Sequence, residues 1–125
     1  KSLNNKIILY WNISDQKLKH LYEYSEGFIF QSVYEGFGIP IIEALKLEIP
    51  MVLSNLKIFR EITENKSFYF NPINIDSISN AIIELLENKQ KLVLDKIEKN
   101  SILKKFDKFK LSNKLSDIYL ITKNL

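Results

Sequence analysis

Two carboxylates, Glu35 and Glu43, stand on either side of a short glycine-containing segment, with seven residues between them. Gly36 and Gly38 follow the first carboxylate, and Pro40 stands where a proline favours the first turn of a helix. Glycines let backbone N–H groups approach a ligand closely, and a helix N-terminus favours an anion such as a phosphate. The spacing therefore predicts an anion site flanked by two carboxylates.

This site requires a strand before the segment and a helix after it. The apolar run at residues 28–31 predicts a short buried strand, and residues 39–47 predict the helix. Further strands are predicted at residues 6–11, 50–54 and 68–70. Further helices are predicted after a cap at Ser14 or Asp15, at residues 58–62, after a cap at Asp76 or Ser77, and at residues 90–106 and 111–122. The alternation predicts an α/β domain with a parallel sheet.

The composition describes one globular domain. The chain has 125 residues, of which 46% are hydrophobic, and it has no cysteine for a disulfide or a thiolate metal site. No apolar run approaches the roughly 18 residues of a membrane-spanning helix, and no signal peptide is visible. We therefore expect a soluble, cytoplasmic protein. The first residue is Lys1 rather than Met, so we expect a piece of a longer chain.

Positive charge gathers at the C-terminal end. Residues 1–88 hold 8 basic and 11 acidic side chains, a balance of −3, whereas residues 89–125 hold 10 lysines and 4 acids, a balance of +6. The lysines alternate with acids and apolar residues, which favours a solvated helix face over a binding surface. Contact with the inner face of a membrane remains open. A nucleic-acid-binding domain ranks last, because the basic segment lacks interleaved aromatic residues and any nucleic-acid motif.

The segment around the two carboxylates resembles the signature of retaining glycosyltransferases of family 4 (glycosyl transferases group 1), which have the GT-B fold. The matching residues, in order, are Glu35, Gly36-Phe37-Gly38, Pro40, Glu43 and Ala44-Leu45. The resemblance extends from about residue 7 to residue 119. It implies the C-terminal, donor-binding half of an enzyme that moves a sugar from a nucleotide-sugar donor to a glycan or lipid-linked acceptor, with retention of the anomeric configuration.

The resemblance also implies a role for each site residue. Glu35 would accept hydrogen bonds from hydroxyls of the donor sugar, close to the reacting centre, and Glu43 would accept them from the ribose hydroxyls. The N–H groups of Phe37, Gly38 and Ile39 would reach the sugar and the diphosphate, with Gly36 and Gly38 allowing the approach. The ring of Phe37 either packs or contacts the ligand. Ser32 either completes the strand end or faces the phosphates.

The resemblance matches residues 6–11 to the third of six strands in a Rossmann-like sheet, at one edge, and the other three strands would pair as neighbours on the opposite side. Two strands between them would lie upstream of Lys1. Residues 1–125 would then form a partial nucleotide-sugar-binding domain with a helical extension at about 89–125. We expect either a fragment with an unpaired edge, inactive by itself, or a rearranged sheet.

The chemistry that the resemblance implies needs no metal or other cofactor, because the helix dipole and backbone donors stabilise the departing nucleoside diphosphate. The sequence has no paired histidines and no Asp-x-Asp motif. The sequence does not decide whether the donor carries UDP, GDP or ADP. A non-catalytic nucleotide-sugar-binding module is the main alternative. A glycosidase pair is a weaker one, because a carboxylate early in a helix suits binding better than proton transfer.

Four residues outside the motif need an interpretation of their own. Tyr10 and Trp11 stand where the family usually has a glycine, so the pair either stacks on a base or, as we favour, packs in the core or covers a sheet edge. Glu48 stands where the family has a small residue, which predicts a strained helix end. His20, the single histidine, is predicted to be a surface residue.

Overall fold

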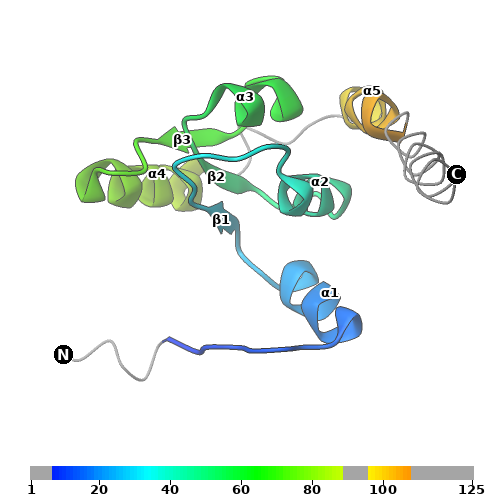
Figure 1. Cartoon of the computed structure of the whole chain (residues 1–125), viewed down its shortest axis with the longest axis horizontal. Helices are drawn as coiled ribbons and strands as arrows, with labels where there is room; N and C mark the ends of the chain where they lie inside the picture. Colours follow the sequence, from blue (N-terminus) through cyan, green and yellow to red (C-terminus); the bar gives the residue numbers. More distant parts are fainter. Residues whose placement is uncertain (1–6, 89–95, 108–125) are drawn as a thin grey trace, which may run out of the picture.

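The computed structural model describes residues 7–88 and 96–107. Three parallel strands form its sheet in the order β1 (Phe28–Phe30), β2 (Met51–Ser54) and β3 (Phe68–Phe70), as Figure 1 shows. Phe28 pairs with Met51, and Val52 pairs with Phe68. The predicted α/β class, the parallel pairing and the neighbouring order of these three strands are confirmed.

In the described part of the chain, four helices pack on this sheet, α2 (Ile39–Lys46), α3 (Lys57–Thr63), α4 (Ile75–Asn88) and α5 (Lys96–Asp107), and α1 (Asp15–Glu23) precedes β1. Because side chains alternate along a strand, Met51 and Leu53 of β2 face one layer and Val52 faces the other. Helices α2, α3 and α5 cover the first face, and α4 covers the second. A strand buried on both faces reads as a continuous apolar run, which explains Met51-Val52-Leu53 before the buried Ser54 ends β2.

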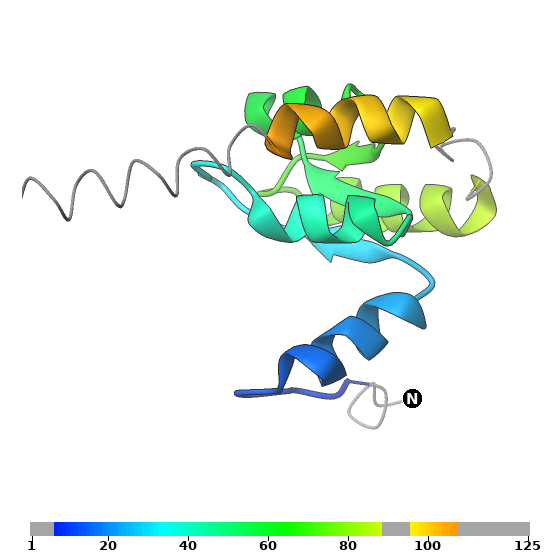
Figure 2. The same ribbon diagram turned by 90° about the vertical axis from the view of Figure 1, so that its right-hand side faces the viewer.

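Helix α5 belongs to the core although it is distant in sequence. Its Ile102 is fully buried in the same cluster as Ile41 and Leu45 of α2. Figure 2 shows α5 within the layered body and α1 set apart from it. The predicted helix at 90–106 is therefore found in part, as α5, while its residues 90–95 and the predicted helix at 111–122 lie outside the described residues.

The strand predicted at residues 6–11 is wrong for its described part. Residues 7–11 form no strand, and the side chains of Ile7, Ile8 and Leu9 are exposed. Apolar residues favour a strand only when a neighbouring strand offers backbone partners, and β1 ends the described sheet on this side without one. The prediction that Trp11 packs in the core is also wrong, because 81% of this residue is exposed. Tyr10 instead lies under the Lys17 ammonium, 4.4 Å from the ring centre.

The helix ends follow capping chemistry. The Ser14 hydroxyl accepts a hydrogen bond from the Lys17 amide, which confirms Ser14 as the cap of α1. Helix α4 begins before the predicted caps, because the side-chain oxygen of Asn74 accepts the Ser77 amide at 2.9 Å. Glu48 has a φ of 59°, in the left-handed region, so the strained end predicted after α2 is confirmed.

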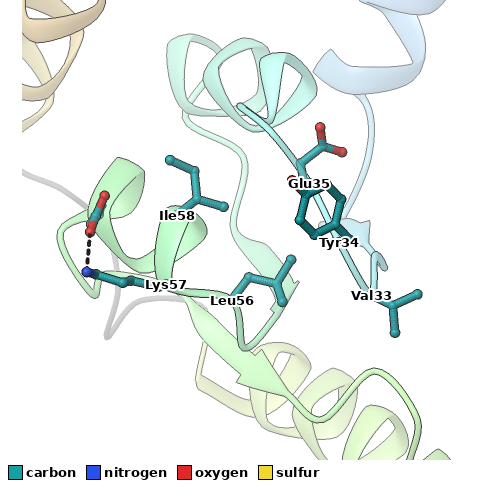
Figure 3. A pocket seen from close by; sticks show the side chains of 7 residues that line it. Val33, Tyr34, Glu35, Leu56, Lys57 and Ile58 are labelled. Carbon is teal, nitrogen blue, oxygen red and sulfur yellow. Dashed lines mark ion pairs between the residues drawn. The ribbon is translucent and has the colours of Figure 1, made fainter.

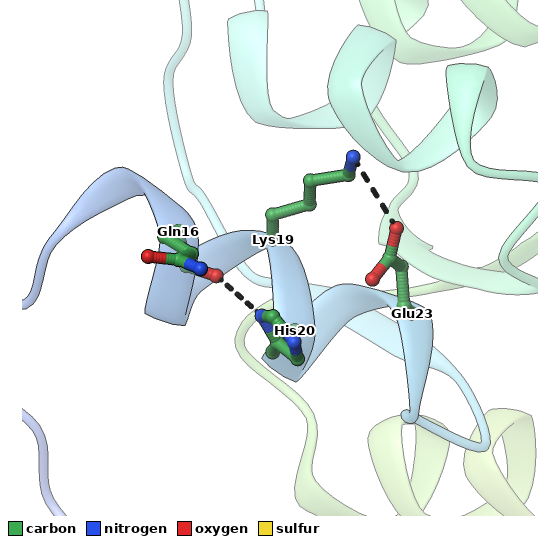
Figure 4. A network of polar contacts seen from close by, with 4 residues as sticks. All are labelled: Gln16, Lys19, His20 and Glu23. Atoms are coloured by element: carbon green, nitrogen blue, oxygen red, sulfur yellow. Dashed lines mark hydrogen bonds and ion pairs between the residues drawn. The ribbon is translucent and has the colours of Figure 1, made fainter.

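Helix α1 carries a small network of exposed polar side chains, shown in Figure 4. The imidazole Nδ1 of His20 donates a 2.8 Å hydrogen bond to the carbonyl of Gln16, and Lys19 pairs with Glu23 at 3.6 Å. All these contacts lie within one helix and are exposed, so they are worth only a few tenths of a kcal/mol each, about 0.2–0.5. The predicted surface position of His20 is confirmed.

Candidate functional site

The two motif glycines have different roles. Gly38 caps the N-terminus of α2 with a φ of +82°, and a Cβ there would lie 3.2 Å from Ile41 and 3.3 Å from Phe59. Both the backbone and the packing therefore require glycine at this position. A Cβ at Gly36, by contrast, would have no atom within 4 Å, so the space beside this residue is open. The predicted close approach of a ligand is available at Gly36 and not on the core side of Gly38.

The loop that leads to Glu35 is tied to the neighbouring strand. The amide of Ser32 donates a 2.8 Å hydrogen bond to the hydroxyl of Ser54, which is fully buried at the end of β2. The Ser32 hydroxyl in turn donates to the carbonyl of Tyr34 at 2.7 Å. Ser32 thus completes the strand end. In the sequence, Ser54-Asn55 resembles a family position near the cleft, and a plain turn explains it equally well; the signal for the role seen here is a polar residue closing an apolar strand.

Glu35 lies in a pocket of about 390 Å³ between this loop and α3. The residue is half-buried, and its carboxylate accepts a 3.1 Å hydrogen bond from the Gly36 amide. Figure 3 shows the loop across the pocket from α3, where Lys57 pairs with Glu61 at 3.8 Å. The remaining walls are Val33, Tyr34, Leu56 and Ile58. An exposed aromatic ring beside carboxylates and a lysine offers stacking and hydrogen bonds to a hydroxyl-rich ligand.

Glu43 lies in a different pocket, a groove of about 250 Å³ between α1 and α2. Tyr22 of α1 lines the same groove as Glu43 of α2. Burial raises the pKa of Tyr22, and the charge of Glu43 and hydrogen bonding with this carboxylate raise the pKa further. The other walls of the groove are Asp15, Leu18, Lys19, Lys46 and Leu47. The structure therefore does not bring Glu35 and Glu43 together in one pocket, as a glycosidase pair would require.

The remaining motif residues divide between packing and exposure. The ring of Phe37 meets Phe106 of α5 edge-on, with centroids 5.9 Å apart, so it anchors the loop to the core. Ile39 begins α2 with its side chain exposed. No side chain caps α2 by a hydrogen bond in the described part of the chain, so its N-terminal amides have no side-chain acceptor there.

A second polar group missed by sequence reasoning surrounds Arg60 of α3. Its guanidinium donates to the side-chain oxygen of Asn55 at 2.6 Å and to that of Asn65 at 3.1 Å. It also lies 4.0 Å from the centre of the Tyr69 ring. Asn55 directly follows β2, so this network holds the end of the strand next to the Glu35 pocket. Only the tertiary structure brings these residues together.

The described residues offer neither a cluster of metal-binding side chains nor a membrane-spanning helix. Residues 7–88 and 96–107 contain no group of three or more metal-binding side chains of the His, Cys, Asp or Glu type. Over the same ranges, no helix has the length and apolar character needed to cross a membrane.

Comparison with known proteins points in one direction. Residues 1–104 match the family model described as Glycosyl transferases group 1. The chain is 38% identical over 84 residues to the serotype-specific mannosyltransferase WbdA of Escherichia coli, covering 67% of this chain and 10% of that protein. It is 34% identical over 76 residues to the O-antigen chain mannosyltransferase B of Escherichia coli, covering 61% of this chain and 20% of that protein.

A further relative transfers a different sugar by name. The UDP-Gal:alpha-D-GlcNAc-diphosphoundecaprenol alpha-1,3-galactosyltransferase of Escherichia coli is 28% identical over 98 residues, covering 77% of this chain and 25% of that protein. The chain thus spans about a tenth to a quarter of the length of these curated relatives. No solved structure matches the chain.

Proposed function

This chain belongs to the family of glycosyl transferases group 1, and from this premise we propose that it forms the donor-binding part of a retaining glycosyltransferase of the family 4 type. The activity is transfer of a hexose from a nucleotide-sugar to a glycan or lipid-linked acceptor. Relatives named for mannosyl and galactosyl transfer support sugar transfer as the reaction.

The observation that carries this proposal is the order of three features around α2. The Glu43 groove lies toward α1, the N-terminus of α2 follows the motif glycines, and the Glu35 pocket lies toward α3. A nucleotide-sugar has three parts in the same order: nucleoside, diphosphate and sugar. We assign the nucleoside to the Glu43 groove, the diphosphate to the α2 N-terminus and the sugar to the Glu35 pocket.

Each part of the site then has a chemical role. The Glu43 carboxylate accepts hydrogen bonds from the two ribose hydroxyls, and Glu35 accepts them from hydroxyls of the donor sugar near the anomeric carbon. The backbone amides from Phe37 to Ile39 and the α2 dipole stabilise the negative charge that builds on the leaving diphosphate. This electrostatic stabilisation acts at the leaving group without a metal in the proposed mechanism.

The names of the relatives extend the proposal to the acceptor. One relative is named for O-antigen chains and another for a diphosphoundecaprenol-linked sugar. We infer that the acceptor here is a surface polysaccharide or its lipid-linked precursor. Transfer then takes place in the cytoplasm, at the inner face of the membrane where such lipid-linked precursors lie. The nucleoside diphosphate of the donor is UDP, GDP or ADP.

Calorimetric titration of the protein with UDP, GDP, ADP and their hexose conjugates tests this assignment. We expect Glu43→Gln to weaken binding of the nucleoside diphosphate and of its sugar conjugate alike, by about tenfold to a hundredfold for lost hydrogen bonds to a charged group. Glu35→Gln should weaken only the sugar conjugate. Glu84→Gln, at an exposed position of α4 on the other side of the sheet, is the matched control.

The outcomes separate three cases. No binding of any of these nucleotides, or binding that Glu43→Gln leaves unchanged, contradicts the donor site. Binding of a nucleotide-sugar that the full-length protein, tested with the acceptor domain present, neither transfers nor hydrolyses identifies the alternative, a non-catalytic nucleotide-sugar-binding module. Binding with transfer, lost in both glutamate variants, supports the enzyme.

A further inference from the structure

Tyr22 connects α1 with the rest of the structure. Its ring packs against Phe28 of β1, with centroids 5.4 Å apart and an interplanar angle of 51°. Helix α1 has no fully buried residue, so this half-buried tyrosine is one of its few inward contacts. The ring is therefore held at a defined place relative to the sheet.

The hydroxyl of this fixed ring meets Glu43. Tyr22 and Glu43 line the same groove, one from α1 and the other from α2, close enough for the charge of the carboxylate and hydrogen bonding with it to raise the pKa of Tyr22. A tyrosine of ordinary pKa already keeps its proton at neutral pH, and burial and the neighbouring carboxylate hold the pKa of Tyr22 above that value, so the hydroxyl is the donor of this pair.

A glutamate on an exposed helix face would otherwise sample several rotamers, and ordering it on ligand binding would reduce affinity. A carboxylate has about four lone-pair positions, so it can accept the tyrosine hydroxyl and still accept two further hydroxyls. Lys19 and Lys46 also line the groove and balance the charges of Asp15 and Glu43 there.

We propose that Tyr22 is a positioning residue for Glu43, which it holds in the rotamer that accepts the ribose hydroxyls of the donor nucleotide. This inference rests on the function proposed above, because it assigns the ribose to Glu43. It adds a residue from outside the motif, 21 positions before the carboxylate in the sequence, to the donor site.

The test compares ribonucleotides with their 2′-deoxy forms. UDP, GDP, ADP and the corresponding 2′-deoxynucleoside diphosphates are titrated into the wild type and into Tyr22→Phe, which keeps the ring on Phe28 and removes only the hydroxyl. We expect the preference for the ribose form to fall about twofold to tenfold, the effect of one lost hydrogen bond. A merely structural role would weaken both forms equally and leave the ratio unchanged.

Tyr24→Phe is the matched control, since Tyr24 directly follows α1, is 82% exposed and stacks on His20. It should leave the preference for ribose unchanged. A Tyr22→Phe/Glu43→Ala double variant completes the test: if Tyr22 acts through Glu43, removing its hydroxyl has no further effect in the Glu43→Ala background.

The results distinguish the two proposals. If Glu43→Ala abolishes the preference for ribose while Tyr22→Phe retains it, the positioning role of Tyr22 is overturned and the donor site stands. If the wild type binds none of these nucleotides, or Glu43→Ala binds them as the wild type does, the donor site fails and the role of Tyr22 fails with it.

Discussion

The buried hydroxyl of Ser54 accepts a 2.8 Å hydrogen bond from the amide of Ser32, joining the ends of β2 and β1. The two residues are 22 positions apart, and the bond fixes where the loop toward Glu35 leaves the sheet. Because the Ser32 hydroxyl then donates to the carbonyl of Tyr34, the buried Ser54 side chain orients the loop through Ser32 and Tyr34.

Replacing Ser54 by alanine should leave the part-buried Ser32 amide without its acceptor. We expect Ser54→Ala to lower the free energy of unfolding by about 1–3 kcal/mol, the cost of an unsatisfied buried donor. Urea denaturation followed by circular dichroism measures this loss. Ser79→Ala, at an exposed position on α4, should stay within about 0.5 kcal/mol of the wild type. Equal stability of the two variants would show that the bond contributes little.

Alanine substitution should lower the stability of the protein at Gly38 and leave it nearly unchanged at Gly36. Gly38→Ala places a side chain at a φ of +82° and against Ile41 and Phe59. It should lower the free energy of unfolding by about 2–4 kcal/mol through backbone strain and overpacking. Gly36→Ala has open space and should leave stability nearly unchanged. If a ligand occupies that space, however, its affinity should fall about tenfold, and thermal unfolding with and without nucleotide-sugar separates the two effects.

Tyr69 should make the protein more sensitive to alkali. Burial raises its pKa above the usual value, against the smaller lowering by its bond with Thr63 and the charge of Arg60. The folded state therefore holds the phenol proton more tightly than the unfolded state. This contribution to stability is complete below about pH 10 and is lost as the pH rises from there through the folded-state pKa.

The Tyr69→Phe variant tests this pH dependence. At pH 8 it should lose about 1 kcal/mol through the missing hydrogen bond to Thr63. Above pH 10 its stability should fall less steeply than that of the wild type, as urea unfolding between pH 8 and 11 would measure. Tyr34→Phe is the control, because Tyr34 is 89% exposed. Parallel curves for wild type and Tyr69→Phe would contradict the expected linkage.

Helix α5 should be necessary for a stable core. Ile102→Ala removes a fully buried side chain between α2 and α5, so it should cost about 2–5 kcal/mol in the free energy of unfolding. Ile97 belongs to the same helix but is 80% exposed, and Ile97→Ala should change stability by less than about 0.5 kcal/mol. Similar losses for both variants would contradict the packing of α5 described here.

Local patterns were sufficient for several features of this protein. The apolar runs predicted β1, β2 and β3, because each is short and bounded by turn residues. The burial predicted for the first run is wrong, since Ile29 of β1 is 48% exposed, whereas β2 is buried throughout. The glycines and Pro40 predicted the start of α2 to within a residue, since they act on the backbone at their own positions. The cap of α4 was predicted too late, because Asn74 was not recognised as an acceptor for the Ser77 amide.

The sequence by itself determined the α/β class, the glycine turn before α2 and the two carboxylates around it, because these depend on neighbours within a few residues. The tertiary structure alone decided that residues 7–11 form no strand and that Glu35 and Glu43 line separate pockets. It also decided that Ser54 holds the loop and Tyr22 meets Glu43. Strand pairing and side-chain contacts of this kind join segments about twenty residues apart, and local periodicity carries no information on which segments meet.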